Sequence, residues 1–214
     1  MNRFFKIYQL VKELYSNIFK STLSSNKKIL IGIGGGGSNI VEYIDKSYPK
    51  EFETMIINSD KEALSSKNIE NKLLLNTVDG YGCGSNENCG LLRTDAIVLQ
   101  NIKKFISNSN DVNIIVTLGG GVGSGSTKAI VKYLNEKRIK FNIFVVYPFS
   151  WEGSKRMNRA INTVKFIKKY DINLSEFYND DLKQYGNIGM ATCFNILNKN
   201  IYLEINKKHF PNQT

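Results

Sequence analysis

Short apolar runs alternate with longer amphipathic stretches along most of this chain. The runs fall at residues 29–33, 54–57, 72–75, 112–118, 142–147 and 172–177, and stretches with helical periodicity lie between them. Runs of this length favour β-strands, and their alternation with helices favours parallel pairing. The pattern predicts an α/β fold, a Rossmann-like three-layer domain whose mostly parallel sheet is covered by helices on both faces.

Glycine-rich segments follow three of the predicted strands. GGGGSN (34–39) and GGGVGSG (119–125) each lie between a predicted strand and a predicted helix, the helices being at 40–46 and 126–134. The third segment, GYGCGSN (80–86), precedes apolar positions at helical spacing. Glycine amides approach an anion closely, and the positive end of a helix attracts it. Together the segments predict one phosphate site beyond the carboxyl ends of the strands.

Neither common phosphate-loop pattern is present in residues 119–125. They lack the lysine of G-x-x-x-x-G-K-[ST], since Lys128 comes too late, and they lack the spacing of G-x-G-x-x-G. For one such segment alone, the alternative is a tight strand-to-helix connection that binds nothing. The occurrence of three segments at successive strand ends favours a ligand site.

Six motifs occur in an order that resembles the tubulin/FtsZ family of GTPases, and within it the bacterial cell-division FtsZ branch. The resemblance runs from about residue 28 to about residue 205. The motifs are GIGGGGSN (32–39), INSDKEAL (57–64), GYGCGSNENCG (80–90), GGGVGSG (119–125), PFSWEGSKR (148–156) and YNDDL (178–182). The fourth is similar to the tubulin signature.

The resemblance implies GTP or GDP and Mg²⁺ as cofactors. Asp60 would lie near the metal or the terminal phosphate, Glu152 and Arg156 would bracket the ribose and the base side, Asn179 would bind the guanine edge, and Phe194 would stack on the base. The phosphates would be wrapped through backbone amides, with the third segment sensing the terminal phosphate. This phosphate set comprises Gly34, Gly35, Gly36, Gly37, Asn39, Gly84, Asn86, Gly119, Gly120, Gly121, Val122, Gly123, Ser124 and Gly125.

Some residues depart from the FtsZ pattern. Val122 and Ser124 stand where FtsZ usually has GGGTGTG, and valine donates no hydrogen bond. Losing one hydrogen bond costs about 0.5–1.5 kcal/mol, so binding would survive at reduced affinity. The aspartate that would clamp guanine falls at Lys199, and a shifted alignment that recruits Asn198 or Asn200 instead stays open.

The sequence ends at Thr214, soon after a helix expected from residue 191. In FtsZ a second domain follows, whose synergy loop activates water at the nucleotide of the neighbouring subunit. The resemblance therefore implies an FtsZ-like GTP/GDP-binding protein of cell division or a related filament system, with poor hydrolysis unless an acidic loop is supplied in trans. The alternative is a non-enzymatic, degenerate paralogue that caps or modulates filaments of a full-length FtsZ-like partner.

Length and composition predict one domain at 28–205, between an N-terminal extension at 1–27 and a polar tail at 206–214. The first 20 residues place apolar side chains at helical spacing with a basic side. This helix either docks on its own domain, which we favour, or lies on a membrane surface. Interrupting charges exclude a signal peptide or a spanning helix.

The cysteines, the histidine and the net charge predict no second site. Cys83 and Cys89 are interpreted as small fillers rather than a disulfide, and a reducing cytoplasm is the predicted compartment, with membrane-peripheral contact if the first helix binds a bilayer. The cysteines lack metal-ligand spacing, and His209 lies in the tail. The net charge of +10 permits nucleic-acid contact, but the lysines are dispersed and no binding motif accompanies them, so nucleic acid is not favoured.

Overall fold

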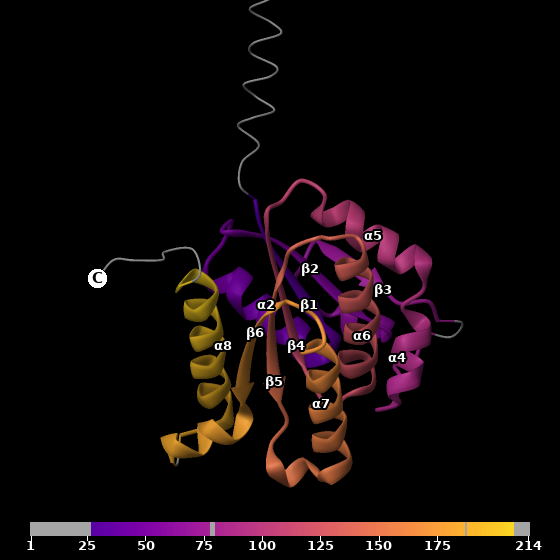
Figure 1. Ribbon diagram of the computed structural model, residues 1–214. Coiled ribbons are helices and arrows are strands. Elements are labelled where there is room, and N and C mark those ends of the chain that lie inside the picture. Colours follow the sequence, from indigo (N-terminus) through magenta and orange to yellow (C-terminus); the bar gives the residue numbers. More distant parts are fainter. Residues whose placement is uncertain (1–26, 78–79, 187, 208–214) are drawn as a thin grey trace, which may run out of the picture.

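The computed structural model describes residues 27–77, 80–186 and 188–207. Its strands form one parallel sheet with helices on both faces, which confirms the predicted α/β class (Figure 1). The strand order is β3-β2-β1-β4-β5-β6, so the direction of winding reverses between β1 and β4. The strands are β1 (Lys28–Ile33), β2 (Phe52–Asn58), β3 (Asn71–Leu74), β4 (Asp111–Thr117), β5 (Asn142–Tyr147) and β6 (Asn173–Tyr178).

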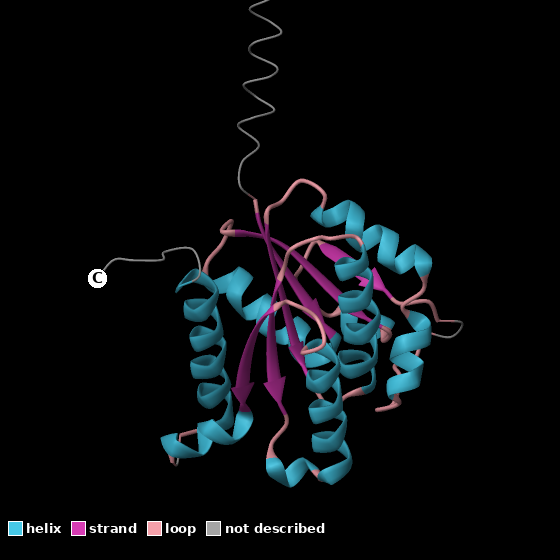
Figure 2. Cartoon of the chain, viewed as in Figure 1, coloured by secondary structure: helices cyan, strands magenta, loops and turns pink. Residues whose placement is uncertain are grey.

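Helices pack on the two faces as separate layers (Figure 2). One face carries α2 (Gly34–Ser47), α3 (Lys61–Ser65) and α8 (Met190–Lys207). The other carries α5 (Ala96–Ile106), α6 (Gly121–Glu136) and α7 (Ser154–Ile167), with α4 (Glu87–Arg93) packed against α6. The short 3₁₀ turns η1 (Ser150–Glu152) and η2 (Asn179–Tyr185) follow β5 and β6.

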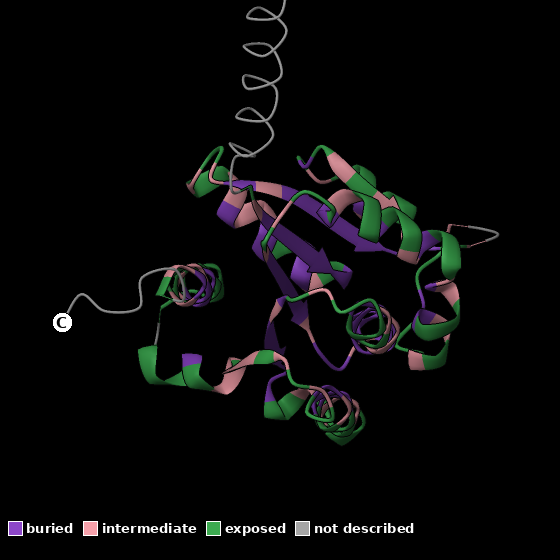
Figure 3. Cartoon of the chain, turned by 45° about the horizontal axis from the view of Figure 1, so that its top comes forward, coloured by how far each residue is buried: buried purple, intermediate pink, exposed green. Residues whose placement is uncertain are grey.

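Alternating side chains of each central strand enter opposite cores. In β1, Ile29, Ile31 and Ile33 belong to the core beneath α5, α6 and α7, while Leu30 belongs to the core beneath α2 and α8. Figure 3 shows the buried strands enclosed by helices whose outer surfaces are exposed. Burial on both faces explains why the strands read as continuous apolar runs rather than as alternating ones.

Two helices begin earlier than their sequence periodicity indicated. We expected helices from residues 40 and 126, but α2 begins at Gly34 and α6 at Gly121, inside the glycine segments. Glycine disfavours helix in isolation. Here tertiary packing decides, because a Cβ on Gly37 would lie 2.7 Å from the carbonyl oxygen of Ile115. The glycines let the first turns of both helices pack directly on the strands.

The expected single helix after the third glycine segment is two helices. Asn86 caps α4 by accepting a hydrogen bond from the amide of Cys89 at 3.3 Å, and Asp95 caps α5 by accepting one from Val98 at 3.0 Å. Of the apolar positions that follow the segment, Leu92 is 78% and Ile97 69% exposed, while Val98, Ile102 and Ile106 are buried. Because the helix breaks before Asp95, one continuous apolar face does not run through both helices.

Cys83 and Cys89 are joined by a disulfide, so our interpretation of them as fillers was wrong. The amide of Asn86 donates to the carbonyl of Cys83 at 2.8 Å, and this turn brings the two Cα atoms to 5.5 Å. That separation is typical of disulfides. Cys193 is free and buried on α8.

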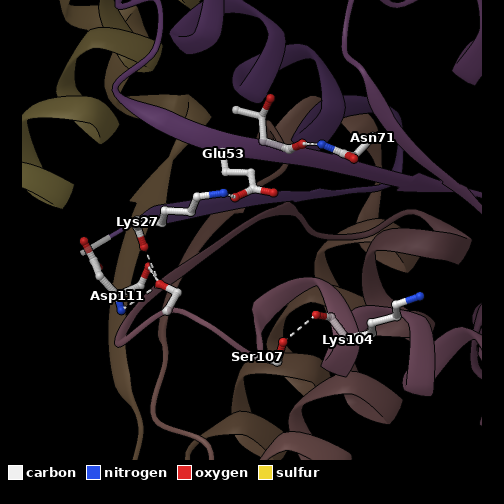
Figure 4. A network of polar contacts seen from close by, with 8 residues as sticks. Lys27, Glu53, Asn71, Lys104, Ser107 and Asp111 are labelled. Carbon is white, nitrogen blue, oxygen red and sulfur yellow. Dashed lines mark hydrogen bonds and ion pairs between the residues drawn. The ribbon is translucent and has the colours of Figure 1, made fainter. Parts of the chain in front are cut away.

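A polar network joins the amino ends of the strands, at the edge of the sheet opposite the glycine segments (Figure 4). Lys27 pairs with Glu53 at 2.8 Å, and the amide of Asp111 donates to the hydroxyl of Ser109 at 3.0 Å. Ser109 in turn donates to the carbonyl of Lys27. These contacts tie the starts of β1, β2 and β4 together. The exposed Lys27–Glu53 pair contributes little by itself.

Most of both predicted end segments lies outside the described residues, including His209 and all but Lys27 of the N-terminal extension. Helix α8 continues through Asn206 to Lys207, the first two residues of the predicted tail. Asn206 accepts a hydrogen bond from Lys28 at 3.0 Å, which fastens the end of α8 to β1. Within residues 27–77, 80–186 and 188–207, no helix has the length and apolar character needed to cross a bilayer.

Candidate functional site

A cavity of about 670 Å³ lies beyond the carboxyl ends of the strands, around the point where the strand order reverses. In open α/β sheets this is where ligands bind. The predicted site residues that line it are Gly34, Gly35, Gly36, Asn39, Asp60, Gly84, Gly120, Gly121, Val122, Gly123, Glu152, Arg156, Asn179 and Phe194. The structure therefore brings together residues from six separate sequence motifs.

Five predicted site residues do not line the cavity: Gly37, Asn86, Gly119, Ser124 and Gly125. Asn86 is exposed and caps α4, while the other four are buried. Gly119 has a φ of +90°, and its amide donates to the buried hydroxyl of Ser124 at 2.9 Å, which closes the turn between β4 and α6. This turn directs the next glycines toward the cavity.

Gly125 brings two helices into backbone contact. A Cβ at this position would overlap the carbonyl oxygen of Glu87, so only glycine lets α4 approach α6 this closely. Gly90 makes the reciprocal approach from α4, where a Cβ would lie 3.0 Å from the Cα of Val122. These glycines and the Asn86 cap hold the third glycine segment beside the start of α6.

The N-termini of α2 and α6 converge on the cavity without side-chain caps. Neither Ile33 nor Gly120, the two N-cap residues, makes a side-chain cap hydrogen bond, and neither first turn contains an acidic residue. A Cβ on Gly34 would lie 3.2 Å from the amide nitrogen of Gly123, so the two glycine turns are adjacent. First-turn amides without partners and two positive helix ends form a site for an anion.

Asp60 stands at the third-segment side of the cavity. Its Oδ1 accepts from the amide of Ala63 at 2.9 Å and caps α3. A Cβ on Gly82 would lie 3.6 Å from its Oδ2. No group of three or more metal-ligating side chains occurs in the part of the chain that the structure describes. Asp60 can therefore offer one carboxylate to a cation that takes its other ligands from phosphate and water, as Mg²⁺ commonly does.

Glu152 and Arg156 form an ion pair on the opposite wall. The carboxylate of Glu152 accepts from the amide of Phe149 at 2.8 Å through Oε1 and from Arg156 through Oε2. Both oxygens are thus engaged. The pair fixes the start of α7 against the β5 turn and places a guanidinium at the cavity wall.

The far end of the cavity is aromatic and contains an unsatisfied amide oxygen. Phe194 on α8 lies edge-on to Phe149 at 6.2 Å between ring centroids, and Phe149 stacks on Trp151 at 4.0 Å. Among the described residues, Oδ1 of Asn179 is buried and has no hydrogen-bond partner. Buried polar atoms are nearly always paired, so this oxygen marks a place for a ligand donor.

Asn198 rather than Lys199 faces the cavity. Asn198 is 7% exposed and lines the wall, one helical turn after Phe194, while Lys199 and Asn200 are exposed. Of the three positions that the two alignments would recruit, only Asn198 therefore lines the cavity. The i, i+4 spacing from Phe194 was the signal that could have identified Asn198.

The sequence reasoning missed several other lining residues. Asn58 and Thr117 are the last residues of β2 and β4, and their place at carboxyl strand ends could have identified them. Gly82, Cys83 and Ser85 lie inside the third glycine segment, which was the signal that could have identified them. The others carry no pattern that separates them from ordinary core or loop positions. They are Ile40, Ala63, Leu118, Val146, Pro148 and Leu197.

Strand order and site together define a Rossmann-like α/β domain with an anion-binding end built from two glycine turns. The chain belongs to the tubulin/FtsZ family, since the model of that family's GTPase domain matches residues 27–187.

Known relatives agree with this assignment. The chain is 32% identical over 187 residues to the cell division protein FtsZ of Buchnera aphidicola subsp. Baizongia pistaciae, which covers 85% of this chain and 48% of that protein. Among solved structures, an empty FtsZ dimer from M. jannaschii matches with a TM-score of 0.73 at 24% identity, covering 86% of this chain and 55% of that one. CetZ2 from Haloferax volcanii, a GTPγS-bound protofilament, matches with a TM-score of 0.71 at 20% identity, covering 82% and 55%. The chain spans about half the length of the curated relatives it matches.

Proposed function

We propose that this domain binds GTP or GDP, with the phosphates at the N-termini of α2 and α6 and the base near α8. The observation that carries the proposal is that two uncapped glycine turns and an unpaired amide oxygen share one cavity. A volume of about 670 Å³ lies within the usual range for small-molecule sites. The family assignment and the GTPγS-bound relative give further support.

The phosphate end supports binding through the backbone. Amides of Gly34 to Gly36 and of Gly120 to Gly123 would hold the phosphates, with Asn39 beside them and Gly84 next to the terminal one. Val122 offers no hydroxyl, but a backbone cradle does not depend on its side chain. Asp60 would supply one ligand to Mg²⁺. When bound, the metal would neutralise phosphate charge.

The lining residues near α8 support binding of guanine. Guanine presents N–H donors beside the O6 acceptor on one edge, and a side-chain amide can both accept from and donate to such an edge. Oδ1 of Asn179 is a free acceptor there, and Asn198 adds a second amide. Since Lys199 is exposed, its charge does not oppose the donors of the base. Phe194 offers a ring for stacking, and Glu152 with Arg156 would contact the ribose side.

We infer poor hydrolysis by this 214-residue polypeptide when it is assayed alone. Asp60 and Glu152 are the carboxylates among the described lining residues. Both oxygens of Glu152 accept hydrogen bonds, and Asp60, whose Oδ1 caps α3, would be taken up by the metal, so neither would act as the base that activates water. An acidic loop from a second, full-length FtsZ-like molecule would supply the missing base.

The cellular role that we propose is in division or a related cytoskeletal filament system of the cytoplasm, because the curated relatives are cell division proteins. The cavity lacks a carboxylate that could act as the general base for hydrolysis, and this also fits a second candidate function. In it the domain is a non-enzymatic paralogue that binds and modulates the filaments of a full-length partner. Membrane contact through residues 1–27 stays a prediction.

The test is binding of fluorescent GTP and ATP analogues to the purified chain with Mg²⁺. Gly120→Glu is the informative variant, because a Cβ there meets nothing within 4 Å and the added carboxylate enters the cavity. Gly189→Glu is the matched control, since its position is equally open and does not line the cavity. We expect guanine-selective binding that Gly120→Glu abolishes and Gly189→Glu retains. Absence of binding by the unaltered chain at high micromolar nucleotide would refute the proposal.

A further inference from the structure

The third glycine segment carries a disulfide at the wall of the nucleotide cavity. Cys83 lines the cavity and is 8% exposed, while Cys89 lies in the first turns of α4 and is partly buried. The bridge closes a short turn in which Gly84 and Ser85 both have positive φ, +51° and +65°. We propose that Cys83 and Cys89 form a reversible thiol–disulfide pair that controls how fast nucleotide leaves the site. This inference rests on the proposed nucleotide binding.

The bridge joins the segment to a rigid support. The backbone of α4 touches that of α6 at Gly90 and Gly125, the hydroxyl of Ser126 donates to the carbonyl of Gly90 at 3.2 Å, and Lys128 pairs with Glu87. Helix α4 is therefore fixed to the helix whose first turn forms the phosphate cradle. Cys89 belongs to this support, so the disulfide extends the support to Cys83.

Without the bridge, the segment would be held mainly near its ends. The amide of Lys61 donates to the carbonyl of Gly80 at 3.0 Å, Arg93 donates to the carbonyl of Tyr81 at 2.6 Å, and the amide of Asn86 donates to the carbonyl of Cys83 at 2.8 Å. These bonds do not involve Gly82, Gly84 or Ser85, which line the cavity and are exposed. The disulfide thus limits how far the segment can move away from a phosphate bound opposite Asp60. Oxidation should slow nucleotide release, and reduction should speed it.

The local geometry also favours re-formation of the bridge. The Asn86 turn and its cap on the amide of Cys89 involve backbone and amide groups, which reduction does not change. With the Cα atoms at 5.5 Å, the two thiols would remain at bridging distance after reduction. In a reducing compartment, a disulfide at a binding loop with one partly exposed cysteine is typical of a regulatory pair rather than a structural one.

The reaction needs only a small disulfide, such as oxidised glutathione. The thiolate of Cys89, the less buried of the two residues, attacks one sulfur of the small disulfide, forming a mixed disulfide and releasing one thiolate that takes up a proton. The thiolate of Cys83 then attacks the sulfur of Cys89 and releases the second thiol. Two cysteine thiols are oxidised and one small disulfide is reduced to two thiols. A dithiol such as dithiothreitol reverses both steps.

The experiment compares nucleotide release in the two redox states. A fluorescent GDP analogue is displaced by excess unlabelled GDP after the full chain has been equilibrated with oxidised glutathione or with dithiothreitol, and mass spectrometry of non-reduced peptides reports the bridge. The variants are Cys83→Ser/Cys89→Ser and, as matched control, Cys193→Ser, which removes the buried cysteine on α8. We expect release to be about fivefold or more slower when oxidised in the unaltered chain and in Cys193→Ser, a size within the range of disulfide restraint. The double variant should show no redox dependence.

Hydrogen exchange of residues 80–86 in the same samples separates this inference from the proposed function. We expect slower exchange in the oxidised chain whether or not nucleotide binds. Failure of the bridge to form in oxidised glutathione, or equal exchange and equal release in the bridged and reduced chains, would overturn the inference. Loss of nucleotide binding in both redox states with exchange still bridge-dependent would overturn the proposed nucleotide function alone.

Discussion

The hydroxyl of Ser124 accepts a hydrogen bond at 2.9 Å from the amide of Gly119, and both residues are buried. This bond closes the turn between β4 and α6 from inside the wall of the cavity. Ser124 therefore supports the glycine turn without lining the cavity itself. The serine that differs from the usual FtsZ signature keeps a hydroxyl where the turn needs an acceptor.

Ser124→Ala should destabilise the fold and weaken nucleotide binding together. The change leaves the buried amide of Gly119 without an acceptor, which costs about 1–3 kcal/mol. Urea unfolding and nucleotide titration measure the two effects. Ser124→Thr restores the acceptor, and its recovery of both quantities is the control. Unchanged unfolding of the alanine variant would contradict this role.

Val122→Thr should tighten binding. Val122 lines the cavity and is 7% exposed, so a hydroxyl there could donate to a phosphate. One added hydrogen bond contributes about 0.5–1.5 kcal/mol, a severalfold decrease in the dissociation constant. Titration with a fluorescent GDP analogue measures the change. Weaker binding at unaltered stability would show that no phosphate oxygen lies within reach.

Asn179→Ala should lower the preference for GTP over ATP. The change removes a buried oxygen that has no partner among the described residues, so we expect no loss of stability from that atom. A lost hydrogen bond to the base would reduce guanine affinity by about 1.5 kcal/mol or less. Competition between the two nucleotides measures the selectivity. Asn200→Ala, on the exposed side of α8, serves as control and should leave selectivity unchanged.

Gly125→Ala should destabilise the domain by about 3 kcal/mol, because the added methyl group has no space between α4 and α6. Gly35→Ala is the matched change, since a Cβ there meets nothing within 4 Å and alanine favours helix. Urea unfolding of both variants checks the contrast. Similar unfolding midpoints would mean that the two helices can separate at little cost.

Acid should destabilise the edge of the sheet at β6. Burial alone would raise the pKa of Glu176, but hydrogen bonds from Lys168 and Tyr147 outweigh it and hold that pKa below the ordinary 4.5. A lowered folded-state pKa stabilises the fold above the unfolded pKa, and this contribution is lost as the pH falls through the folded value. Unfolding free energy should therefore fall below about pH 4.5.

Glu176→Gln should make the unfolding free energy fall less between pH 7 and pH 4. The amide keeps a hydrogen-bonding group in place but cannot ionise. Urea unfolding at pH 7 and at pH 4 gives the slope for each protein. Glu70→Gln, at an exposed position, is the control and should keep the slope of the unaltered chain. An identical slope for all three proteins would contradict the role of Glu176.

Sequence motifs predicted where the site lies, but the tertiary arrangement decided which residues line it. Glycine segments at strand ends marked where the cavity would be, because parallel strands end at one edge of the sheet. The same segments did not distinguish Gly120, which lines the cavity, from Gly125, which packs against α4. Both are glycines in one run, and only the position of a second helix separates their roles.

By itself the sequence determined the alternation of strands and helices, the three glycine turns and the family, because these depend on periodicity and motif order along the chain. Tertiary structure alone decided that α2 and α6 begin inside their glycine turns, that Asn198 rather than Lys199 faces the cavity, and that Cys83 reaches Cys89. The physical reason is that these outcomes depend on how closely backbones approach and how each helix is rotated. Contacts between distant segments set both quantities, and local patterns do not fix them: the spacing from Phe194 points to Asn198, but it does not by itself place that residue at the cavity wall.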